Sequence, residues 1–76
     1  MENKFKSRLI DLRKSMKLSQ SQLAKEINCT QAAIAMWEEG SRTPTMNYII
    51  SLALYFGVTS DFLLGLKDWQ EKSIKV

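Results

Sequence analysis

The feature that most constrains the fold of this chain is a pair of short helix-forming runs separated by only three residues. The first run begins at Ser19, the second ends at about Glu39, and Asn28-Cys29-Thr30 lies between them. A link of that length makes two helices cross steeply, so the second one protrudes. The sequence therefore predicts a helix-turn-helix over residues 19–39.

Apolar residues recur every three or four positions in two further segments, 4–16 and 46–56, and a short fifth helix is expected at 60–65. This spacing puts the apolar residues on one face of a helix. The predicted core positions, including those of the helix-turn-helix, are Phe5, Leu9, Leu12, Met16, Leu23, Ala24, Ile27, Ala33, Ile34, Trp37, Met46, Ile49, Leu52, Ala53 and Phe56. Because no segment alternates with the period of a strand, we expect an all-α fold of five helices.

Residues that begin and end helices flank these segments. Ser19 and Gln22 have the spacing of a capping box, and Thr30, Thr45 and Thr59 stand where N-caps are expected. The expected helix stops, which tolerate left-handed backbone, are Asn28, Gly40, Gly57 and Gly65.

With 76 residues and one cysteine, the chain suits a single small domain and cannot form an internal disulfide. It has no histidine, no cluster of metal-ligand residues and no glycine-rich phosphate loop, and Cys29 has no base partner in the sequence. We therefore expect no enzymatic activity, metal, cofactor or small-molecule ligand. The polar N-terminus and the short apolar stretch 48–58 predict a cytoplasmic protein without signal peptide or membrane span.

The net charge of +3 arises from the N-terminal part of the chain. Residues 1–42 carry eight basic and five acidic side chains, whereas residues 43–76 carry three of each. This asymmetry favours an anionic partner that faces the N-terminal half. A protruding helix can enter the DNA major groove, which is about 12 Å wide, so both features favour double-stranded DNA as the partner.

Five blocks of sequence carry a more specific signal. They are Leu18-Ser19-Gln20-Ser21-Gln22-Leu23-Ala24, Ile34-Ala35-Met36-Trp37-Glu38-Glu39-Gly40, Thr43-Pro44-Thr45, Phe56-Gly57-Val58 and Phe62-Leu63-Leu64-Gly65. In this order and spacing they resemble the XRE family, which includes phage-repressor and Cro-like helix-turn-helix proteins. The resemblance implies a compact five-helix bundle of the phage-repressor DNA-binding type at 1–66, followed by a short C-terminal tail at 67–76. It also implies a sequence-specific regulator of transcription, expected to be a phage or bacterial repressor that binds a pseudo-palindromic operator.

The resemblance further implies roles for individual residues. DNA bases would be contacted by Thr30, Gln31, Ala32, Ala35 and Met36, and phosphates by Arg13, Gln20, Ser41 and Arg42. Gln31 is the best base reader among them, because a glutamine amide can bind adenine through two hydrogen bonds. Arg13 and Glu38 match an ion pair of some relatives. Trp37 and Cys29 are interpreted as packing residues, not as a base-stacking ring and a redox sensor.

Two departures from the family pattern affect these expectations. Ala32, Ala35 and Met36 are apolar where relatives are often polar, so contacts with thymine methyl groups and DNA shape would carry more of the specificity. Lys17 stands at a turn position where relatives prefer glycine or asparagine. The apolar recognition helix also keeps open a second function, that of a protein-interaction module of antitoxin or antirepressor type.

A homodimer is expected from apolar residues that lie near the C-terminal end and off the predicted core face. They are Tyr48, Ile50, Leu54, Leu66 and Trp69. Such a dimer would present two recognition helices one DNA turn apart, about 34 Å, which suits a pseudo-palindromic site.

Overall fold

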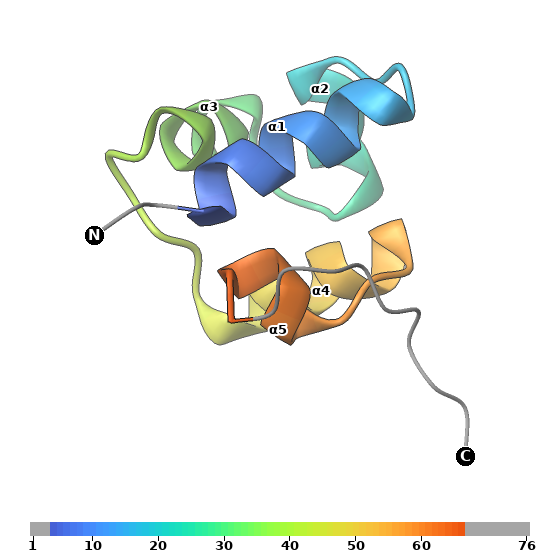
Figure 1. Ribbon diagram of the computed structural model, residues 1–76. Helices are drawn as coiled ribbons and strands as arrows, with labels where there is room; N and C mark the ends of the chain where they lie inside the picture. Colours follow the sequence, from blue (N-terminus) through green and yellow to red (C-terminus); the bar gives the residue numbers. More distant parts are fainter. Residues whose placement is uncertain (1–3, 67–76) are drawn as a thin grey trace.

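The computed structural model describes residues 4–66 of the chain. Its five helices are α1 (Lys4–Ser15), α2 (Gln20–Glu26), α3 (Gln31–Glu39), α4 (Met46–Phe56) and α5 (Ser60–Leu64). Figure 1 shows α1, α2 and α3 on one side of the molecule and α4 with α5 on the other. Helix α1 contacts α3 and α5, α2 packs against α3, and α4 packs against α5. The predicted fold of five helices is confirmed over the described residues, and the tail at 67–76 lies outside them.

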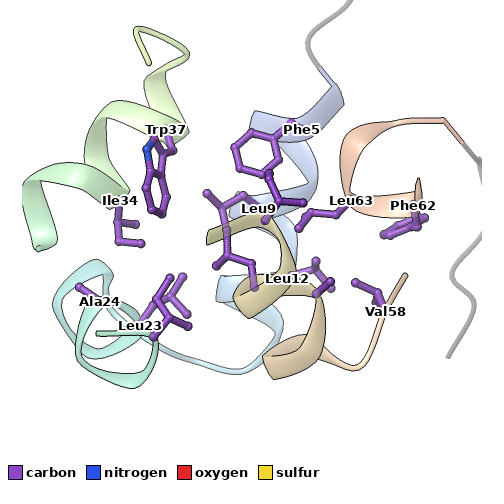
Figure 2. Packing of buried hydrophobic residues seen from close by; sticks show 14 residues of the cluster. Phe5, Leu9, Leu12, Leu23, Ala24, Ile34, Trp37, Val58, Phe62 and Leu63 are labelled. Atoms are coloured by element: carbon purple, nitrogen blue, oxygen red, sulfur yellow. The ribbon is translucent and has the colours of Figure 1, made fainter. Parts of the chain in front are cut away.

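One apolar core joins the five helices. Its most deeply buried large side chains are Leu9, Leu23, Ile34, Ile49, Leu52 and Leu63. Figure 2 shows Leu9 of α1 at the centre, between Ile34 and Trp37 on one side and Leu63 on the other. Since every helix supplies at least one of these residues, burial of apolar surface holds all five helices in place.

Arg8 fastens α1 to α5 at the edge of this core. Its Nη1 donates to the backbone oxygen of Phe62 at 2.5 Å, and its guanidinium carbon lies 4.2 Å from the centre of the Phe62 ring. The cation therefore faces the π surface of the ring while it also satisfies a carbonyl of the last helix. These contacts join residues that are 54 positions apart.

Two of the predicted core positions are wrong. Met16 is 47% exposed and Met46 is 60% exposed. Met16 follows the last residue of α1, so helical spacing no longer determines where its side chain points. Met46 is the first residue of α4 and precedes the turn that packs on the core. Phe56, at the other end of α4, is half-buried.

All five helices end in the same backbone arrangement, in which a left-handed residue follows the helix and the next amide donates to the carbonyl five residues back. The left-handed residues, with φ between 58° and 85°, are Lys17, Asn28, Gly40, Gly57 and Gly65. The hydrogen bonds, 2.8 to 3.2 Å long, run from Leu18 to Arg13, Cys29 to Ala24, Ser41 to Met36, Val58 to Ala53 and Leu66 to Asp61. The four predicted stops are confirmed, and Lys17 adds a fifth.

The four predicted N-cap positions are confirmed, and three of the four side chains make a capping hydrogen bond. Gln22 N–H donates to Ser19 Oγ at 3.0 Å and Ser19 N–H donates to Gln22 Oε1 at 2.7 Å, which completes the capping box. Thr30 and Thr59 each accept a backbone N–H at 3.1 Å. Thr45 is the N-cap of α4 and has the extended backbone of that position, but its side chain makes no capping hydrogen bond.

Candidate nucleic-acid interface

The link between α2 and α3 fixes where α3 begins. Ile27 is buried, Asn28 has a left-handed φ of 61°, and Cys29 packs half-buried against the core. Burial raises the pKa of the Cys29 thiol, because the thiolate would lose hydration there. A neutral packed thiol agrees with the predicted packing role. The next residue, Thr30, is the N-cap of α3, so the orientation of α3 is set directly by this buried link.

An ion pair ties α1 to α3. Arg13 Nε donates to Glu38 Oε2 at 2.6 Å, and Arg13 Nη2 donates to Glu38 Oε1 at 3.0 Å. The side chains are 13% and 7% exposed, so both charges are largely removed from water. Hydrogen bonding to Glu38 raises the pKa of Arg13, although burial acts in the opposite direction. The predicted pairing of these two residues is confirmed.

The same arginine also holds the loop between α1 and α2, because its Nη1 donates to the carbonyl oxygen of Leu18 at 2.8 Å. Every guanidinium nitrogen of Arg13 thus has an internal acceptor. The contact of Arg13 with a DNA phosphate stays a prediction. It would have to use the two N–H groups that these three bonds leave over.

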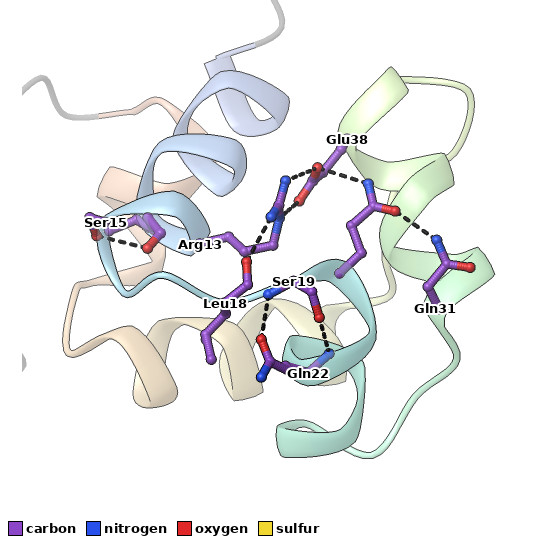
Figure 3. Close-up of polar contacts among 9 residues, drawn as sticks. Arg13, Ser15, Leu18, Ser19, Gln22, Gln31 and Glu38 are labelled. Atoms are coloured by element: carbon purple, nitrogen blue, oxygen red, sulfur yellow. Dashed lines mark hydrogen bonds and ion pairs between the residues drawn. The ribbon is translucent and has the colours of Figure 1, made fainter.

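Two glutamines extend this polar cluster to the surface. Gln20 Nε2 donates to Glu38 Oε1 at 3.0 Å, and Gln31 Nε2 donates to Gln20 Oε1 at 2.7 Å (Figure 3). Glu38 is buried, Gln20 is half-buried and Gln31 is exposed, so the bonds lead from the interior to the first turn of α3. We call these three residues the glutamine chain.

The sequence predicts separate roles for Gln20 and Gln31 and does not indicate the hydrogen bond between them. The available signal was weak, because it consisted only of two amide side chains that each begin one of two consecutive helices. Glu38 was identified as a partner of Arg13, but its second contact, with Gln20, could not be found from spacing alone.

The residues expected to contact bases lie at the N-cap and first two turns of α3. They are Thr30, Gln31 and Ala32, which are exposed, and Ala35 and Met36, which are half-buried. The opposite face of α3 carries Ile34 and Trp37 into the core. Thr30 Oγ1 accepts the backbone N–H of Ala33, so its own hydroxyl hydrogen is left for another acceptor. These five positions offer one amide, one hydroxyl and three apolar side chains.

The loop after α3 supplies two of the expected phosphate contacts, Ser41 and Arg42, and both are exposed. Ser41 Oγ donates to a carboxylate oxygen of Glu39 at 2.8 Å. A phosphate bound by Ser41 would therefore lie beside a carboxylate and be repelled by it. Arg42 stays the stronger of the two predictions.

The residues expected at a dimer interface differ in exposure. Ile50, Leu54 and Leu66 are 46%, 68% and 72% exposed. The expectation that Tyr48 lies off the core is wrong, because its half-buried ring packs with its centre 5.3 Å from that of Trp37. Trp69 lies outside the described residues.

Within residues 4–66, no helix combines the length and the apolar character that crossing a membrane requires. Nor does this part of the chain bring together three or more histidine, cysteine, aspartate or glutamate side chains that could hold a metal ion.

A family model described as helix-turn-helix matches residues 9–63, which include all of α2, α3 and α4. The chain belongs to the XRE-type helix-turn-helix family. The resemblance drawn from the five sequence blocks is thereby confirmed. The XRE-type family consists of DNA-binding regulators of transcription and is not a class of enzymes.

Two regulators are similar in sequence to this XRE-type protein. It is 36% identical over 61 residues to the HTH-type transcriptional regulator YobD of Bacillus subtilis, and 36% identical over 61 residues to the HTH-type transcriptional activator BcrR of Enterococcus faecalis. Each match covers 80% of this chain, 54% of YobD and 30% of BcrR. The chain therefore spans about half of the first relative and about a third of the second.

Solved structures share the arrangement of this XRE-type domain. The P22 c2 repressor, solved in complex with a synthetic operator, is 25% identical, with a TM-score of 0.78 over 83% of this chain and 96% of that one. The restriction-modification controller protein C.AhdI of Aeromonas hydrophila is 30% identical, with a TM-score of 0.73 over 80% and 92%. The LexA repressor of Eubacterium rectale, at 22% identity, shares the fold with a TM-score of 0.79 over 96% and 78%. The phage-repressor type of fold is confirmed.

Proposed function

We propose that this protein regulates transcription by binding specific double-stranded DNA, with α3 inserted in the major groove. The observation that carries the proposal is the division of α3 into two faces. Ile34 and Trp37 fasten one face to the core, while Gln31 and Ala32 at its start are exposed. A helix that is held from one side only can enter a groove with the other. The operator complex of the P22 c2 repressor, which has the same fold, supports this function.

In this proposal, Gln31 and Thr30 form the hydrogen bonds to base edges. The Gln31 amide keeps its oxygen and one N–H for DNA after bonding to Gln20, and adenine offers a complementary donor and acceptor in the major groove. Arg42 contacts the backbone beside the groove. Gln20, Ser41 and Arg13 are further candidates for phosphate contacts.

The apolar residues of α3 extend the reading to thymine. Ala32, Ala35 and Met36 can contact the C5-methyl group, which distinguishes thymine in the major groove. We therefore expect half-sites rich in A·T pairs. Replacing the contacted thymines with uracil removes only the methyl groups and should weaken binding without changing any hydrogen bond.

We further propose that the protein acts in the cytoplasm as a homodimeric repressor at a pseudo-palindromic operator. The exposed side chains of Ile50, Leu54 and Leu66 support an apolar interface between copies. Two copies related by a twofold axis read two half-sites of opposite direction, about 34 Å apart.

Selection from random DNA duplexes tests the function directly. We expect one short inverted repeat to be enriched, and its affinity to fall steeply as salt rises, because phosphate contacts release counterions. Enrichment of no motif would overturn sequence-specific binding.

Two variants then separate base contacts from phosphate contacts. Gln31→Ala should relax the preference at one base pair of each half-site and cost about 1–3 kcal/mol there. Arg42→Ala should weaken binding to all duplexes alike and lower the salt dependence by about one counterion. A uniform loss of affinity in both variants would contradict the role of Gln31.

The interface between copies is tested by Leu54→Lys, with Asn47→Lys as control because Asn47 is an exposed residue of the same helix. Analytical ultracentrifugation should show that Leu54→Lys shifts the population toward monomer, since it buries a charge between copies. Equal association of both variants would exclude Leu54 from the interface.

The apolar surface of α3 also favours a second function, that of a protein-interaction module of antitoxin or antirepressor type. Ala32 and Met36 can serve a protein surface as well as a thymine methyl group. Gel-shift experiments at low salt discriminate the two functions, because a module that has lost DNA binding shifts no duplex at all.

A further inference from the structure

The amide orientation of Gln31 follows from the buried end of the glutamine chain. A carboxylate only accepts hydrogen bonds. Glu38 therefore requires the NH₂ group of Gln20 to face it, at 3.0 Å. The oxygen of Gln20 is then turned toward Gln31, which must present its own NH₂ group, at 2.7 Å. Each step admits only one direction of donation.

This order leaves Gln31 with a fixed set of free groups. One of its two amide hydrogens is used by Gln20, so the oxygen and a single hydrogen remain for a ligand. Adenine presents one donor and one acceptor in the major groove, whereas guanine presents two acceptors. A glutamine with both amide hydrogens free can donate twice to guanine. Gln31, when held in the glutamine chain, has only one free hydrogen and cannot.

We propose that Glu38 is a positioning residue that, through Gln20, makes Gln31 select adenine over guanine. This role rests on the proposed function, and it identifies which residues make Gln31 selective for one base. Arg13 holds Glu38 with two hydrogen bonds, so the carboxylate that sets the direction is itself fixed. Glu38 is 7% exposed and does not need to touch DNA to act in this way.

The test compares two variants that break the same ion pair. Glu38→Gln keeps Arg13 but replaces the carboxylate with an amide, which can turn either its oxygen or its NH₂ group toward Gln20. Arg13→Gln removes the charge partner and keeps the carboxylate. Both are assayed at a temperature at which circular dichroism shows them folded. Gln20→Met is the second variant of the first kind and replaces Glu38→Gln if that protein fails to fold, because it interrupts the glutamine chain and leaves the Arg13–Glu38 pair intact.

The readout is a ratio of two dissociation constants, measured with duplexes that carry either adenine or guanine at one position. That position is the base pair at which Gln31→Ala abolishes the base preference. We expect a ratio of about tenfold or more in the parent protein and in Arg13→Gln. We expect it to fall to within about threefold in Glu38→Gln and Gln20→Met, because the second amide hydrogen becomes free. Arg42→Ala is the control, which should lose affinity with the ratio unchanged. An unchanged ratio in Glu38→Gln and Gln20→Met overturns the proposal.

A measurement without DNA keeps this result separate from failure of the proposed function. In ¹⁵N relaxation of the free protein, the Gln31 side-chain amide should be restricted in the parent and in Arg13→Gln, and mobile in Gln20→Met. Equal mobility in all three overturns the positioning role. If duplex selection enriches no motif, DNA reading fails and the selectivity fails with it, even where the amide is restricted.

Discussion

The α2–α3 half of the domain and its α4–α5 half are organised by different kinds of contact. Around α2 and α3, a bidentate ion pair and two side-chain hydrogen bonds link residues of α1, α2 and α3. In α4 and α5, the largest buried contributions come from Ile49, Leu52 and Leu63, while Ile50 and Leu54 are exposed. Hydrogen bonds depend on direction, whereas apolar burial does not. One half can therefore fix the orientation of an amide, and the other supplies stability and a surface that can adhere to another copy.

The largest effect expected is in the apolar half. Leu52→Ala should lower the free energy of unfolding by about 2–5 kcal/mol, because it leaves a cavity in the core. Leu54→Ala, two positions along the same helix, should change it by less than about 0.5 kcal/mol, because Leu54 is exposed. Urea denaturation of monomeric protein measures both. Similar losses in the two variants would mean that burial does not distinguish these positions.

The polar half should respond next most strongly. Glu38→Ala is expected to lower the free energy of unfolding by about 2–3 kcal/mol, because the largely buried Arg13 loses its charge partner and keeps only the carbonyl of Leu18 as an acceptor. The double variant Arg13→Met/Glu38→Leu removes both charges and should cost less than about 1 kcal/mol. Urea denaturation of the two proteins gives the comparison. A double variant that is less stable than Glu38→Ala would show that the pair stabilises the fold by itself.

A smaller pair of effects, opposite in sign, concerns the left-handed residues that follow α1 and α4. Lys17→Gly should raise the free energy of unfolding by about 1 kcal/mol. Lys17 has a φ of 58°, and glycine adopts this left-handed conformation without the steric strain that a Cβ causes. Gly57→Ala should lower it by about 1 kcal/mol through backbone strain alone, since a Cβ at Gly57 would meet nothing within 4 Å. Thermal denaturation measures both shifts. Changes of the same sign would contradict the backbone explanation.

The smallest effect expected is a change of reactivity at the link between α2 and α3. Because burial raises the pKa of Cys29, alkylation by iodoacetamide should reach half its maximal rate at higher pH in the native protein than in urea. The folded pKa lies above the unfolded one, so this thiol contributes stability at low pH that is lost as the pH rises through the folded value. Coincident pH profiles would show that Cys29 is not desolvated.

The sequence predicted the described helices because their signals are local. Three- and four-residue spacing, the Ser19–Gln22 capping box and the left-handed stops at Asn28 and Gly57 all act within a few residues. Spacing failed where a helix end decides the outcome, as at Met46, because periodicity does not say how far along a helix the core extends.

The sequence predicts which residues form the candidate site, but not all of the contacts between them. The ion pair of Arg13 with Glu38 followed from the family resemblance, and it is present. The bond between Gln20 and Gln31 was not predicted, because it depends on side-chain direction across the angle between two helices. Tyr48 was misjudged for the same reason, since its contact with Trp37 comes from another helix.

The helix ends, which turn the chain within a few residues, keep the links between helices short, and this affects how quickly the protein folds. Successive helices are joined by links of only three to six residues, so most native neighbours are close in sequence. Helical domains with such local contacts fold in microseconds to milliseconds. The contact of Arg8 with Phe62 is different, because it must bring together residues 54 positions apart. We therefore expect the docking of α1 onto α5 to form late and to set the folding rate, while the two helices of the helix-turn-helix associate early.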